Sequence, residues 1–218
     1  MTSTGDSNSA AERAYLVTRE RIIDGTHQPD TMLSESALAA DLGVSRTPVR
    51  VALARLQDEG WITVYPKRGA LVQGVTERTV AELADARFVL ETTAVDRASD
   101  TLRQRLADRL EASIEQQRQA LADRDLRSFI ALTIQFHRGF VEAGGNRVVV
   151  ELYGQLADRH RFVLFAAGDH LFSRAAEIIA EHETLTQQLR AGNPTEFAAT
   201  LRRHITNNAP PGGSSTTQ

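Results

Sequence analysis

The sequence predicts a mostly α-helical fold, in which three short helices and a β-hairpin precede an all-α helical bundle. Three observations predict it. Up to about Val75 the elements are short and interrupted by Gly and Pro, and two strand-like segments follow the third helix. From Thr76 onward the chain has long stretches of 3.6-residue hydrophobic periodicity and no convincing strand.

The composition excludes several classes of protein. Hydrophobic residues make up 41% and charged residues 24%, as is typical of globular proteins. The absence of cysteine excludes a disulfide scaffold, a cysteine-ligated zinc finger, an iron–sulfur cluster and a thiol nucleophile. No apolar run reaches the roughly 18 residues that span a bilayer, and no secretory signal is visible, so we expect no membrane partner and a cytoplasmic location. The net charge of −3 argues against a uniformly basic surface but leaves a local basic patch open.

The domain organisation follows from a change along the chain in the length of the predicted elements and in their hydrophobic periodicity. The join near Gly74–Thr76 is the expected boundary between a domain at residues 10–75 and a helical domain at 76–207. Residues 1–9 and 208–218 are polar and rich in Ser, Gly and Pro, so we expect disordered tails there.

Capping residues bound the three N-terminal helices, which are expected at about 10–24, 35–42 and 46–59. The expected N-cap and terminating residues are Ser9 and Gly25, Ser34 and Gly43, and Ser45 and Gly60. Pro48 falls in the first turn of the third helix, where a missing N–H costs nothing. Residues 61–65 and 70–72 then predict a β-hairpin around a turn at 66–69.

Six helices are expected in the second domain, at about 77–99, 101–123, 125–143, 147–166, 171–191 and 194–207. Helix-start and helix-stop signals separate them. These signals are Thr76, Gly144-Gly145-Asn146, Gly168-Asp169 and Gly192-Asn193-Pro194.

The segment from Glu35 to Ala52 has the sterics of a helix-turn-helix. Ala39 is small where two helices must approach closely, and Gly43 can take a positive φ at the turn. The second helix then projects Arg46, Thr47 and Arg50 from its N-terminal half, the part that reaches base edges in the major groove. Arginine offers a bidentate fork to guanine. The alternative is a small helical hairpin whose arginines are simply solvated.

The turn of the hairpin carries Lys67, Arg68 and Gly69, a compact positive tip that suits the minor groove or a phosphate. It gives an acidic protein a locally positive edge beside the helix-turn-helix. The two features together predict a winged helix-turn-helix that binds double-stranded DNA.

The segment LSESALAADLGVSRTPVRVALARLQDEGWITVYPKRGALV resembles the winged helix of the GntR family of bacterial transcription regulators, and the resemblance covers about residues 12–75. It implies that Ser45, Arg46, Thr47 and Arg50 contact DNA from the recognition helix and that Lys67, Arg68 and Gly69 do so from the wing. One departure is Val51, where the family usually has Glu. We expect this change to free Arg50 from an intrahelical partner.

The second domain is similar to the FCD effector-binding domain of the FadR-like branch of that family. The resemblance rests on Glu82–Glu91, Phe136–Asn146, Glu181-His182 and His204. It implies a domain that binds a small-molecule effector and forms a homodimer.

His137, His182 and His204 are the candidate metal ligands. They lie inside amphipathic helices but show no metal-binding spacing such as HExxH, so a packing role for each stays open. The family resemblance implies a divalent metal, with zinc the first choice, completed in many relatives by an Asp one turn before the first His. Here that position is Thr133, which leaves two alternatives: a weaker site that favours an anionic effector, or a lost metal.

Arg87 and Thr133 are the candidate effector-binding residues. Arg87 lies one turn before Glu91, so it forms either an ordinary i,i+4 ion pair or a contact with an effector carboxylate.

We therefore expect a homodimeric, metabolite-responsive transcription regulator rather than an enzyme. It would act as a repressor on a near-palindromic operator, with an organic acid as effector. Two alternatives remain: a DNA-binding dimer without a small-molecule effector, and a metalloenzyme in which three histidines hold an open zinc.

Overall fold

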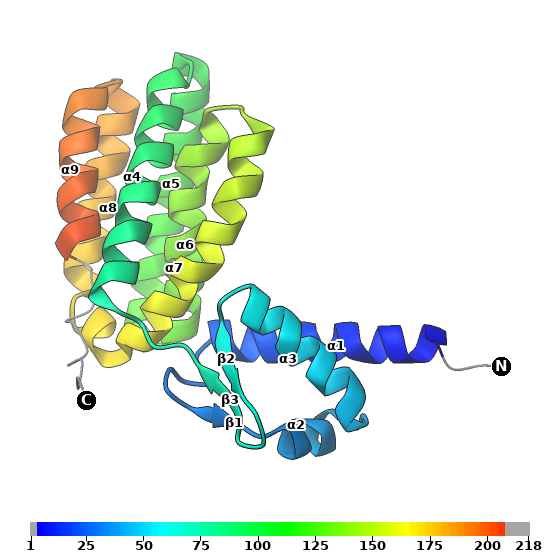
Figure 1. Ribbon diagram of the computed structural model, residues 1–218. Coiled ribbons are helices and arrows are strands. Elements are labelled where there is room, and N and C mark those ends of the chain that lie inside the picture. Colours follow the sequence, from blue (N-terminus) through cyan, green and yellow to red (C-terminus); the bar gives the residue numbers. More distant parts are fainter. Residues whose placement is uncertain (1–3, 208–218) are drawn as a thin grey trace. The chain divides into compact units, whose positions relative to one another are not determined.

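The computed structural model describes residues 4–207, which form two compact units with the division between Val75 and Thr76. The mostly α-helical fold class predicted from the sequence is confirmed (Figure 1). Within the described residues, no helix is both long and apolar enough to cross a membrane. Residues 1–3 and 208–218, where tails were predicted, lie outside the described part of the chain.

The first unit contains the three predicted helices, α1 (Thr4–Ile23), α2 (Glu35–Leu42) and α3 (Arg46–Asp58). The prediction of disorder is wrong for residues 4–9, because α1 begins at Thr4 and runs through Ser9, which therefore does not cap it. Polar residues such as Ser and Asn disfavour a helix by only a few tenths of a kcal/mol each. Extending an existing helix carries no nucleation cost, so the helix continues through them.

Local signals set the ends of α2 as expected. The Ser34 hydroxyl accepts a hydrogen bond from the Ala37 N–H (3.5 Å), and Gly43 has the left-handed conformation (φ 63°). Ser45 occupies the N-cap position of α3 in an extended conformation, but its side chain makes no capping hydrogen bond. The hydroxyl of Ser45 thus stays on the exposed N-terminal end of α3.

The predicted hairpin is confirmed as β2 (Ile62–Tyr65) paired with β3 (Gly69–Val72). A short strand not predicted from the sequence, β1 (Met32–Leu33), pairs antiparallel with the other edge of β3, giving the order β1-β3-β2. Two residues are too few to show the alternation of side chains that identifies a strand. The strand forms because β3 offers an unpaired edge next to it.

Gly69 is the position in this sheet that tolerates no side chain. Its φ is +119°, and a Cβ there would lie 2.3 Å from the backbone oxygen of Leu33 on β1. Gly69→Ala is therefore expected to lower the free energy of unfolding by about 1–3 kcal/mol, measured by urea denaturation. Gly43→Asn is the control, since no atom lies within 4 Å of its Cβ position and Asn tolerates a left-handed conformation. Equal losses in the two variants would contradict the proposed steric cause.

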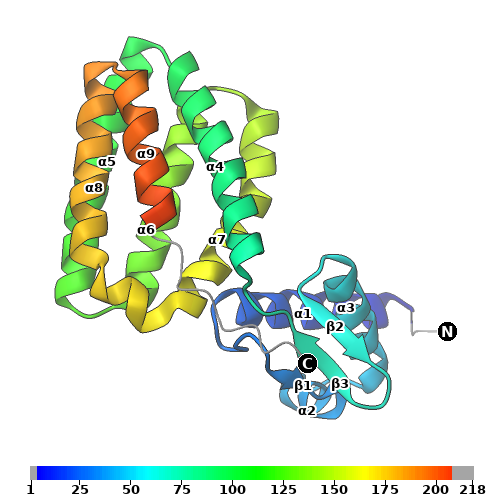
Figure 2. The same cartoon turned by 60° about the vertical axis from the view of Figure 1, so that its left-hand side comes forward.

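The second unit is a bundle of six helices, as predicted. They are α4 (Glu77–Arg97), α5 (Asp100–Ala122), α6 (Leu126–Ala143), α7 (Arg147–Ser173), α8 (Ala175–Ala191) and α9 (Pro194–Asn207). α5 packs against α6 and α8, α4 packs against α6 and α9, and α6 also packs against α7. Figure 2 shows α9 between α8 and α4, so the last helix of the chain lies beside the first helix of this unit.

The break predicted at Gly168 is confirmed, whereas the start of the following helix, predicted at about residue 171, differs from the prediction. The chain bends at Gly168 (φ 45°, ψ −117°), but α7 continues to Ser173, and α8 begins at Ala175. These dihedrals are not helical, so α7 consists of two helical segments that meet at a kink at Gly168, and glycine adopts such a conformation readily. The predicted cap at Thr76 is confirmed, because its hydroxyl accepts from the Thr79 N–H (3.0 Å).

Large aromatic side chains fill the middle of the bundle. Phe129, Phe136, Phe140, Tyr153 and Phe197 are at most 1% exposed. Phe140 packs edge-to-face on both Phe136 (5.1 Å between ring centroids) and Phe197 (4.9 Å). Buried polar side chains lie against these rings, since Phe136 stacks on His182 with 4.0 Å between ring centroids.

Candidate functional site

α3 has one buried and one exposed face. Val49, Leu53 and Leu56 on the buried face are at most 2% exposed, and they hold the helix against the rest of the first unit. The four predicted DNA-contact residues of this helix region are all exposed: Ser45, Arg46, Thr47 and Arg50. The amphipathic pattern thus orients the polar side chains away from the core.

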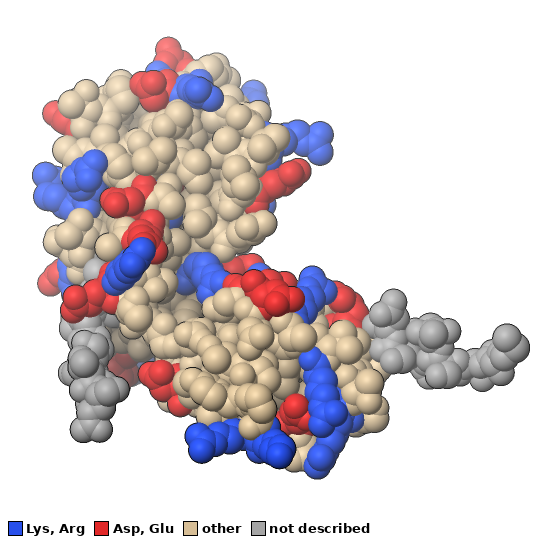
Figure 3. All heavy atoms as spheres, viewed as in Figure 1, with Lys and Arg blue, Asp and Glu red and all other residues tan. Residues whose placement is uncertain are grey.

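The wing lies beside this exposed face. A recess on the first unit is lined by Arg46 and Arg50 of α3 together with Lys67, Arg68 and Gly69 of the β2–β3 turn. Figure 3 shows blue atoms gathered along this edge of the first unit, next to the β2–β3 turn and α2 in Figure 1. The structure therefore brings the two predicted arginines of the recognition helix and the three predicted wing residues to one basic surface.

Arg50 has an ion-pair partner on another helix, which the expectation drawn from Val51 did not foresee. Its Nε donates to Oε2 of Glu35 at 2.8 Å. Glu35 is the first residue of α2, and its side chain is 28% exposed against 64% for Arg50. The partner comes from the neighbouring helix rather than from α3 itself, so the loss of the family's Glu at Val51 does not leave Arg50 unpaired.

In the second unit, the three candidate metal ligands meet in the interior. His137 on α6, His182 on α8 and His204 on α9 are at most 3% exposed, and their ligand nitrogens lie within 4.8 Å of one another. The Nε2 atoms of His137 and His204 are 3.0 Å apart. The sequence separates these residues by tens of positions, and only the packing of three helices makes them a cluster.

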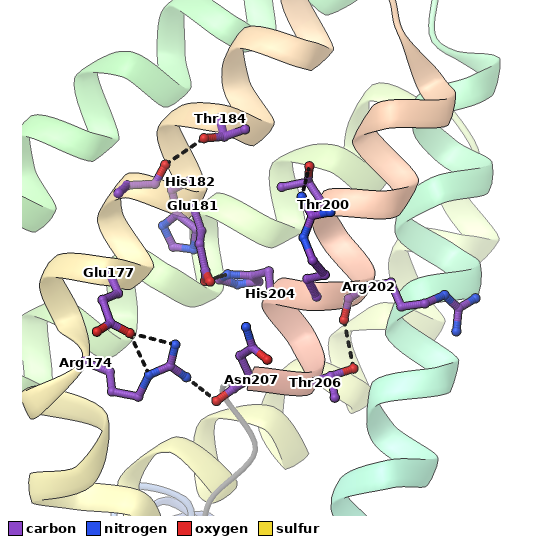
Figure 4. A network of polar contacts seen from close by, with 12 residues as sticks. Arg174, Glu177, Glu181, His182, Thr184, Thr200, Arg202, His204, Thr206 and Asn207 are labelled. Carbon is purple, nitrogen blue, oxygen red and sulfur yellow. Dashed lines mark hydrogen bonds and ion pairs between the residues drawn. The ribbon is translucent and has the colours of Figure 1, made fainter.

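Each histidine is held by a hydrogen bond at its other ring nitrogen. The Nδ1–acceptor pairs are His137 with Glu91 (2.8 Å), His182 with Gln117 (2.8 Å) and His204 with Glu181 (2.7 Å). Figure 4 shows the last of these pairs, with His182 beside Glu181 on α8 and His204 on α9. Partners of this kind fix the tautomer and the ring orientation of metal-binding histidines.

The partners establish which ring nitrogen carries the proton. The Gln117 amide nitrogen donates to Ser113 (3.4 Å), so its oxygen faces His182 and accepts from Nδ1. Two carboxylates accept from the other Nδ1 atoms. All three Nε2 atoms are therefore unprotonated and direct their lone pairs toward one another, and Nε2 of His182 has no hydrogen-bond partner among the described residues.

A metal ion fits this arrangement better than a shared proton. Burial, reinforced by neighbouring positive charge, lowers the pKa of His137 and His182 well below the ordinary histidine value, and burial also lowers the pKa of His204. The rings are thus neutral at pH 7. Tetrahedral zinc with Zn–N bonds of about 2.0–2.1 Å needs nitrogens about 3.3 Å apart, close to the spacing of the His137 and His204 pair.

Thr133 lies one turn before His137 on α6 and is only 4% exposed. Its hydroxyl has no hydrogen-bond partner among the described residues. A threonine hydroxyl is a poor metal ligand beside a carboxylate, so the donor set of this chain is three neutral imidazoles with at least one open position.

A second buried group adjoins the histidines. Arg87 of α4 donates from Nε to Glu91 (3.0 Å), and the Tyr153 hydroxyl of α7 donates to the same carboxylate oxygen (2.9 Å). Arg87 also donates from Nη1 to Nε2 of His160 (2.9 Å). The i,i+4 ion pair with Glu91, one of the two alternatives for Arg87, is therefore present, and it is buried.

His160 of α7 was not assigned a role from the sequence. Since arginine is only a donor, Nε2 of His160 must accept, and its proton lies on Nδ1. That Nδ1 is buried and has no partner among the described residues, while burial and the Arg87 charge lower the pKa of His160 well below its ordinary value. The site thus contains a neutral histidine with an unused donor.

Sequence reasoning missed Gln117, His160 and Tyr153 as parts of this site. Gln117 and Tyr153 carry no local signal, because their partners lie 62–65 positions away. His160 carries no local signal of burial either, because it stands between Arg159 and Arg161 in the sequence. All six helices of the unit supply at least one side chain to the cluster.

A helix-turn-helix with a basic wing, followed by a helical unit that encloses a polar cluster, defines a two-domain transcription regulator. Comparison with known proteins identifies the family. Residues 10–72 match the bacterial regulatory proteins of the gntR family, and residues 82–207 match the FCD domain. The chain belongs to the GntR family and carries an FCD domain; it is a transcription regulator and not an enzyme.

Relatives agree with this assignment along most of the chain. The protein is 31% identical over 195 residues to an HTH-type transcriptional regulator in an unstable DNA locus of Streptomyces ambofaciens, covering 88% of this chain and 80% of the relative. It is 28% identical to the gluconate operon transcriptional repressor of Bacillus subtilis, covering 90% and 82%. The fold resembles the crystal structure of a putative GntR regulator from Rhodococcus sp. RHA1, with a TM-score of 0.76 at 24% identity over 91% of this chain and 95% of that one.

Proposed function

We propose that the protein is a homodimeric, metabolite-responsive repressor that acts in the cytoplasm on a near-palindromic operator. Residues 10–75 would bind DNA, and residues 76–207 would bind the effector and form the dimer. The observation that carries the effector part is the set of three unprotonated Nε2 atoms converging inside the helical unit. The repressor role is supported by relatives that are named as repressors.

The DNA-binding part of the proposal assigns base contacts to Ser45, Arg46, Thr47 and Arg50 and backbone contacts to Lys67, Arg68 and Gly69. The four residues of the recognition-helix region are exposed, and five residues of the set line one basic recess, which supports the assignment: Arg46, Arg50, Lys67, Arg68 and Gly69. Arginines of the recognition helix suit guanine edges, while the compact wing suits phosphates.

The homodimer is supported by apolar side chains that the described chain leaves exposed on the helical unit. Val89 of α4 and Val148 and Leu152 of α7 are 53–64% exposed. A hollow lined by Leu90, Val141 and Val149 lies among these helices. An exposed apolar surface of this kind is typical of an interface, and a two-fold dimer would present two winged helices to two half-sites.

The effector part assigns His137, His182 and His204 to a divalent metal, zinc being the first choice. When bound, the ion would supply positive charge to a carboxylate at its open position. The unpartnered Thr133 hydroxyl, Arg87 Nη2 and His160 Nδ1–H are donors for such an anion. A carboxylate effector would thus satisfy buried groups that have no partner among the described residues.

Coupling to DNA follows from differential affinity. An effector that binds one arrangement of the two domains more tightly than another shifts the population toward that arrangement and changes operator affinity. The alternative, a dimer without a small-molecule effector, predicts no such change. A panel of organic acids tested by thermal melting and by operator binding separates the two, because effector control requires a change in both measurements for the same acid.

The base-reading assignment predicts different effects for two kinds of variant. Arg46→Ala is expected to weaken operator binding by about 1–3 kcal/mol while random-sequence duplex loses less, because a bidentate contact to a base is removed. Lys67→Ala is expected to weaken both duplexes alike and to flatten the salt dependence. Fluorescence anisotropy at several salt concentrations measures both effects. Equal losses on the two duplexes for Arg46→Ala would contradict the assignment.

The metal assignment predicts stabilisation by zinc. At free zinc 100-fold above its Kd, the free energy of unfolding is expected to rise by about 2.7 kcal/mol, which corresponds to a Tm shift of roughly 5–10 °C. His182→Ala should abolish both the shift and the metal content measured by elemental analysis. His170→Ala, which removes an exposed histidine, is the control and should keep both. Thr133→Asp should bind zinc more tightly, since it supplies the carboxylate that this chain lacks. A normal metal content in His182→Ala would refute the site.

A further inference from the structure

The recess between α3 and the wing contains a carboxylate in a place where DNA phosphates are expected. Glu35 lines it together with Arg46, Arg50, Lys67 and Arg68, and it is the one acidic residue among the described residues that line this recess. A carboxylate beside bound DNA weakens binding through its charge. Because its charge opposes DNA binding, Glu35 is expected to serve a purpose other than raising the affinity for DNA.

We propose that Glu35 is a specificity-determining residue, which positions Arg50 for a base and keeps it from a phosphate. This inference rests on the proposed DNA-reading role of α3. The carboxylate accepts a hydrogen bond from Nε of Arg50 at 2.8 Å, and the two residues are 15 positions apart on different helices. Both side chains remain partly exposed, so the pair lies at the surface where DNA would dock.

The geometry of the guanidinium gives the first effect. Arginine has two forks, one formed by Nε with a terminal nitrogen and the other by the two terminal nitrogens. Because Glu35 takes the Nε–H, the terminal fork remains to meet O6 and N7 of a guanine. Holding the long side chain in one orientation before binding also reduces the rotamer freedom that is lost on the operator.

Charge gives the second effect. An arginine that faces DNA can bind any phosphate, and such contacts raise affinity for all sequences alike. Glu35 repels phosphate from this position but tolerates a base edge, which carries no net charge. The pair therefore lowers affinity for random duplex more than affinity for the correct site, which is how a repulsive element produces specificity.

The test is a selection from a random-sequence duplex library, with binding constants measured afterwards on the selected site and on a random duplex. The variants are Arg50→Ala, Glu35→Ala and Glu35→Gln. Glu12→Ala is the matched control, because Glu12 pairs with Arg55 of the same helix (2.9 Å) but does not line the recess. Each carboxylate variant changes the net charge by one, so long-range electrostatics are matched.

Wild type is expected to select a guanine that Arg50→Ala no longer selects. In Glu35→Ala, the preference for guanine over the other bases at this position is expected to fall at least about fivefold. The same variant is expected to bind random duplex several-fold more tightly. Glu12→Ala should keep the guanine preference. In the Arg50→Ala background, the addition of Glu35→Ala should have no further effect at that position.

Glu35→Gln separates positioning from charge and guards against a variant that fails to fold. Its amide oxygen can still accept from Nε of Arg50, so we expect it to keep the guanine preference while binding random duplex more tightly. Two outcomes would overturn the inference about Glu35 but not the proposed function. One is a Glu35→Ala variant that selects the same guanine as strongly as wild type. The other is a Glu35→Gln variant whose affinity for random duplex is unchanged. Wild type that selects no sequence would overturn the proposed function as well.

Discussion

Metal-free protein is expected to lose about 3–4 kcal/mol of its free energy of unfolding between pH 7 and pH 5.5. His137, His160 and His182 have pKa values well below 6.5 in the folded state, with burial as the main cause. In the unfolded chain each titrates near 6.5 and binds a proton as the pH falls. The unfolded state thus binds more protons, so stability is present above pH 6.5 and is lost as the pH falls below it.

The magnitude follows from linkage, because each such histidine contributes about 1 kcal/mol over this interval. Urea denaturation followed by the helical circular dichroism signal in the presence of a chelator measures it. His160→Gln is the diagnostic variant, since its amide oxygen can still accept from Arg87 but cannot titrate. Its pH dependence should be shallower by up to about 1.4 kcal/mol per pH unit. A free energy of unfolding that stays constant from pH 7 to 5.5 would rule out neutral buried histidines.

Glu91→Ala is expected to destabilise the protein by about 3–5 kcal/mol, among the largest effects of any single substitution here. The carboxylate is fully buried and accepts hydrogen bonds from Arg87, Tyr153 and His137. Burial raises the pKa of Glu91, while the Arg87 guanidinium opposes this effect. Its removal leaves a buried guanidinium without its counter-charge, and breaking a buried pair in this way is strongly unfavourable.

Glu181→Ala is the matched control for this prediction. Glu181 also accepts from a site histidine, His204, but its side chain is 24% exposed and water can replace it. We expect a loss of about 1 kcal/mol, typical of one hydrogen bond. Urea denaturation of the two variants at pH 7 measures the difference. Equal losses would mean that Arg87 finds another counter-charge and that Glu91 does not hold the cluster together.

The predictions that succeeded from the sequence depend on short-range interactions. Ser34 caps α2, Gly43 ends it, and Thr76 caps α4, each through hydrogen bonds that span three or four residues. Helical periodicity placed the buried face of α3 and the exposed Arg46 and Arg50. The failures at Ser9 and at the start of α8 concern where a helix begins, because a residue that can cap a helix allows a start there without requiring it.

The sequence by itself determined the fold class, the family and the identity of the side chains that carry charge and lone pairs. Only the tertiary structure decided how these side chains are paired: Arg50 with Glu35, His137 with Glu91 and His182 with Gln117. The physical reason is the distance along the sequence between the residues that interact. A turn of helix is specified by residues three or four apart, whereas these pairs join different helices and exist only once the cores between them have packed.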